Sequence, residues 1–239
     1  MLNRLRECWF SFAGDYCELH NIQLSELPTR ELPVLRGERI NVPGRAGFLF
    51  LPEGVDAYED VGIVCKCITL DEYSFNDVNV WLNQSGFLIF SDEPYRAYKA
   101  RVLDQPSRQS ILTKFDGQVL SIVFSCQPWR YHWPEVPEIT MTNGGTITNP
   151  GKARSAPKII VSGSGDMTVT IGGQLLEFEN VPTGGIIIDS DALECTLAND
   201  SLANQYASFD RFPMLEPGTS EVSWTGATGV KILPRWRDI

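Results

Sequence analysis

The hydrophobic pattern in the first half of the chain predicts a sheet built around residues 61–70. Hydrophobic side chains alternate there with a period of two and occupy both faces, which is typical of a strand inside a sheet. Residues 117–127 alternate as well, but serines interrupt one face, so we expect a strand packed on one side. Two further strands are predicted at residues 86–90 and 95–103.

One short helix is predicted over residues 75–83, between the predicted strands at residues 61–70 and 86–90. Val78, Trp81 and Leu82 recur at the i, i+3, i+4 spacing of a buried helical stripe. Ser74 is an N-cap candidate, because its hydroxyl can accept the backbone N–H of Asp77. We therefore expect the helix to pack on the sheet through this stripe.

The beginning of the chain is expected to form a hairpin over residues 8–19. Gly14-Asp15 is a dipeptide that tolerates the positive φ of a two-residue turn. With the turn at this position, Phe12 pairs with Cys17 across the hairpin.

Prolines and glycines interrupt residues 23–54, which predicts short strands joined by long connections. The strands are expected at residues 39–42 and 48–51. The charged residues of this stretch fit either a solvated surface or a subunit interface, where arginine is enriched. The candidate interface residues are Arg30, Arg36, Arg39 and Arg45.

Residues 127–138 form a break in composition. The stretch contains three prolines, which hold it extended and remove hydrogen-bond donors from a strand ladder, so we place a domain boundary there. Trp129, Tyr131 and Trp133 are candidates for packing between the two domains, because each hides a large apolar area. A sugar-stacking platform is the alternative. The predicted domains span residues 1–130 and 131–239.

The second half has short strands at the spacing of an antiparallel β-sandwich, punctuated by glycines. Its clearest hairpin turns at Gly172-Gly173, which sets Val169 opposite Leu176 and Met167 opposite Phe178. Strands are expected at residues 139–141, 158–162, 167–171, 174–178, 185–188, 193–195 and 230–233.

Composition favours a soluble globular protein. The chain has 239 residues, of which 43% are hydrophobic, and a formal net charge of −10. No run of Lys and Arg could follow a phosphate backbone, and the apolar runs are shorter than the roughly 20 residues of a membrane span. We expect neither specific nucleic-acid binding nor membrane insertion. We expect the protein to be synthesised in the cytosol.

Six cysteines and two histidines bound the metal and redox chemistry. The cysteines lie in strand-like segments and no Cys-x-x-Cys is present, so we expect free buried thiols. His20 and His132 lie in different contexts, which favours neither a zinc site nor a nucleophile–histidine pair. We assign no catalytic residue, metal ligand or cofactor.

Other catalytic motifs are weak. No nucleophile elbow, phosphate-binding loop or dinucleotide fingerprint is placed as its chemistry requires. Asp189-Ser190-Asp191 offers oxygen atoms but lacks the remaining spacing of a calcium loop, so a solvated strand end is expected. The paired carboxylates of glycoside hydrolysis need not be close in sequence, so residue spacing does not test whether this chain has such a pair.

The order of several short segments resembles the distal tail protein family of long-tailed, siphovirus-type bacteriophages. The segments cover nearly the whole chain, and their order is more specific than any one of them. Ala46 within the Gly-Arg turn and the modest C-terminal length depart from the commonest pattern, which gives no support to an added carbohydrate module or a long arm-holding insertion. The segments are Val42-Pro-Gly-Arg-Ala-Gly47, Trp81-Leu82, Gly86-Phe-Leu-Ile-Phe-Ser-Asp-Glu-Pro-Tyr-Arg-Ala-Tyr98, Val123-Phe-Ser-Cys-Gln-Pro-Trp129, Ile147-Thr-Asn-Pro150, Pro157-Lys-Ile-Ile-Val-Ser-Gly-Ser-Gly-Asp166, Gly185-Ile-Ile-Ile-Asp189 and Phe212-Pro-Met-Leu-Glu-Pro-Gly218.

The resemblance implies a mainly β protein, with a β-rich ring-forming hub domain that has one short helix, followed by a galectin-like antiparallel β-sandwich. It implies a non-enzymatic virion protein of the tail tip or baseplate. Its copies would form a homohexameric ring that joins the major tail tube protein to the tail-tip hub protein, near receptor-binding proteins, and leaves a channel for DNA.

Two other functions stay open at this point. One is a carbohydrate-binding module for host attachment, in which Trp224 or Trp236 is exposed for stacking on a saccharide, with core burial as the alternative for each ring. The other is a wall-degrading hydrolase.

Overall fold

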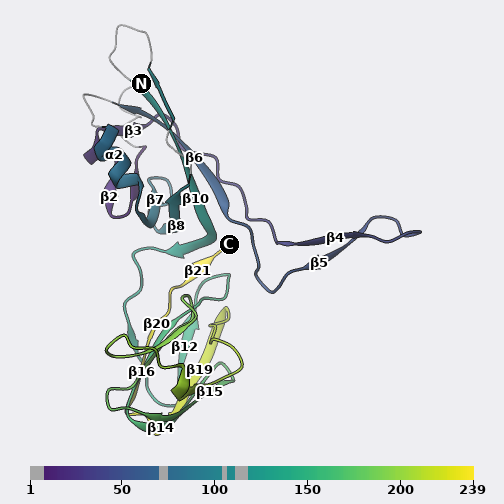
Figure 1. Cartoon of the computed structure of the whole chain (residues 1–239), viewed down its shortest axis with the longest axis vertical. Helices are drawn as coiled ribbons and strands as arrows, with labels where there is room; N and C mark the ends of the chain where they lie inside the picture. Colours follow the sequence, from purple (N-terminus) through teal and green to yellow (C-terminus); the bar gives the residue numbers. More distant parts are fainter. Residues whose placement is uncertain (1–7, 70–74, 104–106, 111–117) are drawn as a thin grey trace. The chain divides into compact units, whose positions relative to one another are not determined.

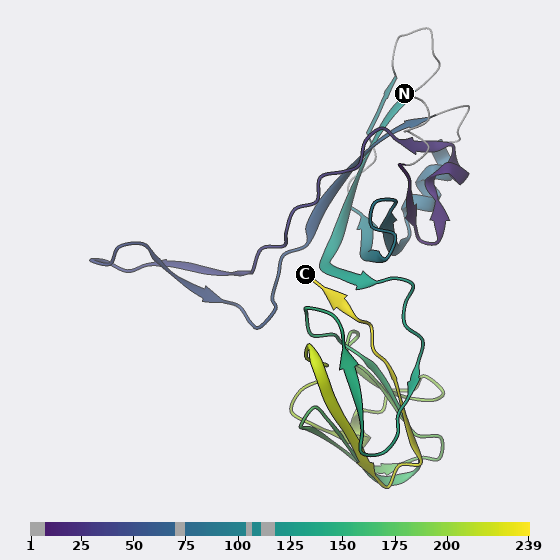
Figure 2. The same ribbon diagram turned by 180° about the vertical axis from the view of Figure 1, so that it is seen from behind.

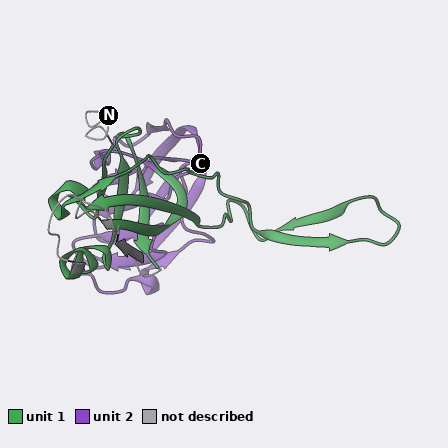
Figure 3. Ribbon diagram, turned by 90° about the horizontal axis from the view of Figure 1, so that it is seen from above, with its two compact units in different colours: residues 1–130, 239 green, residues 131–238 purple. Residues whose placement is uncertain are grey.

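The computed structural model describes residues 8–69, 75–103, 107–110 and 118–239. They form two compact units, residues 1–130 with 239 (unit 1) and residues 131–238 (unit 2), coloured separately in Figure 3. Strand makes up 53% of the structure and helix 7%, which confirms the predicted mainly β class with one short helix.

Unit 1 is built on a curled antiparallel sheet with the strand order β2-β1-β7-β8-β10-β6-β3, and β9 also pairs with β10 (Figure 1). The predicted strands of this unit are present within a few residues of their expected bounds, and β3 and β9 are strands that were not predicted. The strands are β1 (Phe10–Phe12), β2 (Asp15–Tyr16), β3 (Ile22–Leu24), β6 (Val61–Thr69), β7 (Ser85–Phe90), β8 (Arg96–Val102), β9 (Ser107–Ser110) and β10 (Gln118–His132).

Strand β6 lies between β10 and β3, in the interior of the sheet as predicted. Only one of its faces is covered within the chain, however. Ile63, Cys65 and Cys67 are fully buried on one face, whereas Val64 on the other is 46% exposed. The expectation that both faces meet apolar neighbours is therefore wrong for the described residues, because the elements that form the core pack on one side of the sheet.

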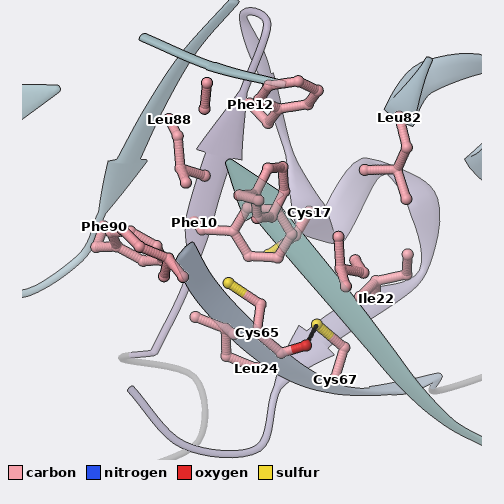
Figure 4. Close-up of a cluster of buried hydrophobic side chains, with 14 of the residues drawn as sticks. Phe10, Phe12, Cys17, Ile22, Leu24, Cys65, Cys67, Leu82, Leu88 and Phe90 are labelled. Atoms are coloured by element: carbon pink, nitrogen blue, oxygen red, sulfur yellow. Dashed lines mark hydrogen bonds between the residues drawn. The ribbon is translucent and has the colours of Figure 1, made fainter. Parts of the chain in front are cut away.

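The single helix, α2 (Phe75–Leu82), contributes the predicted stripe to this core. Val78, Trp81 and Leu82 are each 2% exposed. The indole N–H of Trp81 donates to the carbonyl of Phe12 at 3.0 Å, so the helix is tied to β1 by a buried hydrogen bond. Figure 4 shows the aromatic and aliphatic side chains of β1, β3, β7 and α2 converging with the thiols of β6. Ser74, the candidate cap, lies outside the described residues.

The first hairpin turns one residue earlier than predicted. Phe12 pairs with Asp15, not with Cys17, and Cys17 begins a short 3-10 helix (Cys17–His20). The turn residues Ala13 and Gly14 have φ of 51° and 97°. The predicted register assumed glycine in the first turn position, whereas here alanine occupies it and the prediction is wrong.

Unit 2 is an antiparallel β-sandwich, as predicted. Its sheets have the orders β11-β20-β13-β16-β17 and β12-β19-β14-β15-β18, and their inner faces share one buried cluster. The register of the Gly172-Gly173 hairpin is the predicted one, with Val169 opposite Leu176 and Met167 opposite Phe178. The elements are β11 (Ile139–Thr140), β12 (Gly145–Asn149), β13 (Lys158–Ser162), β14 (Gly165–Ile171), β15 (Gln174–Val181), β16 (Ile186–Asp189), β17 (Glu194–Leu197), η2 (Asn204–Tyr206), β18 (Ala207–Ser208), β19 (Gly218–Thr225), β20 (Gly229–Leu233) and β21 (Arg237–Asp238).

All six cysteines are free thiols, as predicted; Cys8 is half-buried and the others are buried. Burial raises the pKa of the Cys126 thiol to about 12, so it stays protonated at neutral pH. Within the described ranges, no group of three or more His, Cys, Asp or Glu side chains could hold a metal ion. No helix in that part of the chain has the length and apolar character needed to cross a membrane.

Candidate functional site

A hairpin of unit 1, residues 36–53, which we call the arm, exposes four consecutive large hydrophobic side chains, at residues 48–51. Its strands β4 (Gly37–Asn41) and β5 (Phe48–Pro52) form a two-stranded sheet of their own. Figures 2 and 3 show them reaching away from the main sheet of the same unit. An isolated two-stranded hairpin is at best marginally stable in water, so the arm has the character of an element that is completed by a partner.

The apolar side chains of the arm are concentrated in β5. Phe48 is 49% exposed, Leu49 41% and Leu51 54%. The register places Arg39 opposite Phe50 and Asn41 opposite Phe48, so the two phenylalanines share one face of the hairpin while Leu49 and Leu51 share the other. Both faces of the arm therefore offer apolar contact.

The tip of the arm is the segment that carries part of the sequence resemblance. Gly44 and Gly47 both have φ of 78°, a left-handed conformation that favours glycine. The N–H of Arg45 donates to the carbonyl of Val42 at 3.1 Å, which closes the turn. This geometry leaves Arg45 exposed at the end of the arm.

The base of the arm is fixed to the body of unit 1. Leu35 and Tyr58 form an antiparallel bridge, and the N–H of Glu59 donates to the carbonyl of Val34 at 2.9 Å. The Tyr58 ring packs edge-on against Trp129, with 5.5 Å between centroids. Trp129 is buried, so the base of the arm is attached to the end of β10 through an aromatic contact.

The segment that leads to the arm is held by Arg30. Its guanidinium forms ion pairs with Asp92 and Glu93 and lies 5.0 Å from the centroid of the Phe90 ring. Glu93 also binds Arg130, with 3.4 Å between Nη1 and the carboxylate. Arg30 is thus engaged within its own unit.

The other three candidate arginines lie on the arm itself. Arg36 pairs loosely with Glu53 at 3.6 Å across the base, Arg39 stands over the Phe48 ring, and Arg45 is at the tip. The structure therefore brings Arg36, Arg39 and Arg45 onto one hairpin and places Arg30 beside its base. Their role as interface residues stays a prediction.

Charge separates the arm from the rest of the chain. The arm has three arginines and two glutamates, hence a net charge of +1, whereas the whole chain carries −10. An acidic surface is therefore complementary to it.

The candidate aromatic residues are distributed between the two units. Trp129 is buried in unit 1, Tyr131 is buried in unit 2 and Trp133 is half-buried in unit 2. Their packing between domains stays a prediction. Trp236 is 5% exposed within the core of unit 2, which favours burial over saccharide stacking. Trp224 packs half-buried against the same core.

Sequence reasoning selected the arginines of the arm and missed its hydrophobic residues. The run Phe-Leu-Phe-Leu at residues 48–51 has no polar residue in alternation, which indicates that both faces of the strand require cover. That pattern is the signal that could have identified the surface.

Comparison with known proteins supports the fold. No protein-family model and no curated protein sequence matches the chain. The Dit protein of phage SPP1, described as a paradigm of the hub adsorption apparatus in phages that infect Gram-positive bacteria, matches with a TM-score of 0.70 and 16% identity, over 94% of this chain and 97% of that one.

The baseplate of phage P2 in its activated conformation also matches. The structure with Ca gives a TM-score of 0.58 at 10% identity, over 94% of this chain and 96% of that one, and the structure with Sr gives 0.57 at 11%, over 94% and 97%. The chain therefore shares a fold with phage hub and baseplate proteins over nearly its whole length, and the resemblance seen in the sequence is confirmed at the level of fold.

Proposed function

We propose that this chain is a distal tail protein of a siphovirus-type bacteriophage, a structural hub at the tail tip. The support is twofold. The fold matches a phage hub protein and a phage baseplate over 94% of this chain. The order of short sequence segments points to the same family without reference to any structure.

In this proposal the chain acts as a homohexameric ring in which the arm of each copy binds the next copy. The single observation that carries it is the exposed apolar strand β5 on an otherwise uncovered hairpin. A contact between one patch on a subunit and a different patch on its neighbour is heterologous, and such contacts close into rings when the rotation between neighbours allows it. A donor arm and an acceptor surface meet this requirement.

The acceptor in this proposal is the acidic body of the neighbouring copy. The arm is the basic element of an acidic chain, so the pairing of arm with body is favoured over the pairing of body with body. Val64, which is exposed on the open face of β6, is an apolar side chain that such a contact could bury.

The axial partners follow from the tail-tip position. We propose that one side of the ring binds the major tail tube protein and the other the tail-tip hub protein, with receptor-binding proteins further out. DNA passes through the ring without sequence-specific contact, which agrees with the lack of a Lys/Arg-rich run. The proposed role is structural and includes no reaction.

Electron cryomicroscopy of the phage particle that carries this chain tests the proposal. A collar of six copies at the tail apex, each arm seated on the next copy, is the expected result. A tail apex without this chain would overturn the hub assignment. A collar whose arms point into solvent would support the hub assignment and contradict the proposed role of the arm in contacts between copies.

A further inference from the structure

A cavity lies in unit 2 beside the turn that joins β14 to β15. Its volume is about 620 Å³, within the range of roughly 300–1,000 Å³ that is common for ligand pockets. Three parts of the chain line it: Arg154, the turn region from Ile171 to Leu175, and a segment that we call the strap, residues 210–216. The strap lines the cavity through Asp210, Arg211, Met214 and Glu216. No residue of the arm contributes to it.

The strap is held in place at both ends. Phe209 and Phe212 contact each other edge-to-face at 5.3 Å and pack against the core of unit 2. Leu215 is 1% exposed and exchanges both backbone hydrogen bonds with Ser155, each at 3.0 Å. The side-chain amide of Asn149 donates to the Leu215 carbonyl at 2.9 Å. One wall of the cavity is therefore preformed.

The opposite wall is the hairpin turn. Gly172 and Gly173 have φ of 56° and 82°, the left-handed conformations that a tight two-residue turn requires. The side-chain amide of Gln174, the next residue, donates to the backbone carbonyl of Arg211 on the strap. The turn and the strap are thus linked across the cavity, and a ligand would meet groups whose positions are already set.

The polar groups of the cavity carry both signs. Asp210 and Glu216 offer carboxylate acceptors, and Arg154 and Arg211 offer guanidinium donors. Within the part of the chain that the structure describes, the side chains of Asp210, Arg211 and Glu216 form no ion pair. The carboxylates of Asp210 and Glu216 therefore lie in the same cavity as the guanidinium of Arg211 without an ion pair to it.

This mixture selects among ligand classes. An anion would meet two carboxylates, and a cation would meet two guanidinium groups. A neutral ligand rich in hydroxyl groups can satisfy both, because each hydroxyl donates one hydrogen bond and accepts others. Leu175, which is 50% exposed, and Met214 add apolar surface against which the C–H face of a ring can pack.

We propose that this cavity of unit 2 binds a saccharide. Asp210 and Glu216 accept hydrogen bonds from its hydroxyl groups, Arg154 and Arg211 donate to its oxygen atoms, and Leu175 contacts its ring. The site is distinct from the tryptophan surfaces considered from the sequence, since Trp236 is buried. It is also independent of the ring, because its residues all belong to unit 2.

Saturation-transfer NMR on the full chain tests this proposal, with glucose, galactose and N-acetylglucosamine as neutral probes and inorganic phosphate as the anionic competitor. We expect at least one sugar to bind, and phosphate not to displace it. The double variant Asp210→Asn/Glu216→Gln should weaken that binding about tenfold or more, because hydrogen bonds to charged groups are the strong ones.

The matched control is Glu177→Gln/Glu179→Gln, which removes the same charge from exposed positions of β15 in the same unit. It should bind the sugar as the wild type does, and so should an arm variant that no longer assembles. Absence of binding for all three sugars, equal binding by the cavity variant, or displacement by phosphate would each overturn the proposal. None of these results bears on the ring.

Discussion

The guanidinium of Arg39 lies over the ring of Phe48, 5.0 Å from its centroid, on a hairpin that pairs with no other strand among the described residues. A cation placed on an aromatic face gains roughly 0.5–1 kcal/mol at an exposed site, which is too little to hold a two-stranded hairpin alone. The contact orders the Phe48 ring and presents it beside Phe50 on one face of the arm. The arm is therefore shaped for binding before a partner arrives.

The first prediction concerns assembly through the arm. The double variant Phe48→Asp/Leu51→Asp should abolish oligomers, because each exposed apolar anchor of an interface contributes about 2 kcal/mol or more when it is buried. The free energy of unfolding should change by no more than about 1 kcal/mol, since both side chains are exposed within the chain and only the Arg39–Phe48 contact is lost. Native mass spectrometry over a concentration series, with urea unfolding in parallel, measures both quantities.

Leu175→Asp provides the control for this experiment, because Leu175 is equally exposed but lies in unit 2. It should assemble as the wild type does. A wild-type chain that stays monomeric at every concentration, or a double variant that assembles normally, would contradict the role of the arm.

A second prediction concerns the attachment of the arm. Arg30→Met should destabilise unit 1 by about 2 kcal/mol, because it removes the cation shared by Asp92 and Glu93, of which Glu93 keeps Arg130, in a site where the Arg30 side chain is 16% exposed. Arg36→Met removes a pair at 3.6 Å whose members are more than half exposed, and should cost less than about 0.5 kcal/mol. Urea unfolding of both variants compares them, and equal effects would refute the argument.

The third prediction uses a pH-dependent ion pair in unit 2. Burial raises the pKa of Asp189, but hydrogen bonds from Arg235, Ala192 and Asp191 outweigh it and lower that pKa from 3.8 to about 2. The folded state therefore favours the carboxylate, and the stabilisation is fully present above pH 3.8 and lost as the pH falls toward 2. A shift of this size corresponds to about 2 kcal/mol.

Asp189→Asn tests that linkage. The variant should be less stable than the wild type by about 2 kcal/mol at pH 7, and the difference should shrink when unfolding is measured near pH 2. Asp200→Asn, a change of the same kind in the exposed loop after β17, is the control and should leave the profile unchanged. A difference between wild type and Asp189→Asn that stays constant with pH would show that the ion pair is not its source.

The fourth prediction concerns the contact between β7 and the first hairpin. A Cβ added to Gly86 would lie 2.7 Å from the Cα of Ala13, closer than real Cβ contacts, so Gly86→Ala should destabilise unit 1 by about 2 kcal/mol. Gly62→Ala on β6 meets no atom within 4 Å and should be neutral or slightly stabilising. Thermal unfolding of the two variants distinguishes them, and a stable Gly86→Ala protein would require a different course for the turn at Ala13.

These contacts also explain which parts of the fold the sequence could predict. The β14–β15 register follows from its two turn glycines, which allow few alternatives. The β1–β2 register does not, because Ala13 adopts a φ of 51° that its residue type disfavours and that the approach of Gly86 helps to fix. Strand β19 was missed since Val222 and Trp224 are its only large apolar residues.

The candidate site was predicted in part, for a related reason. A hydrophobic pattern indicates that a side chain requires cover, and it does not say whether the cover comes from the same chain. Val64 was therefore expected to meet apolar neighbours, and Phe48 was passed over. The structure leaves both side chains exposed. Of the four candidate arginines, Arg36, Arg39 and Arg45 lie together on the arm, whereas Arg30 forms ion pairs within the body of unit 1.

The exposed arm also constrains how the free subunit must behave before it is used. An exposed apolar β-hairpin with unpaired edges can pair with strands of other chains and aggregate. Glu38 and Arg39 lie opposite Leu51 and Phe50, and Arg45 precedes the apolar run at residues 48–51. Charges in such positions act as gatekeepers that slow edge-to-edge pairing, so the arm combines an apolar strand with residues that limit unspecific aggregation.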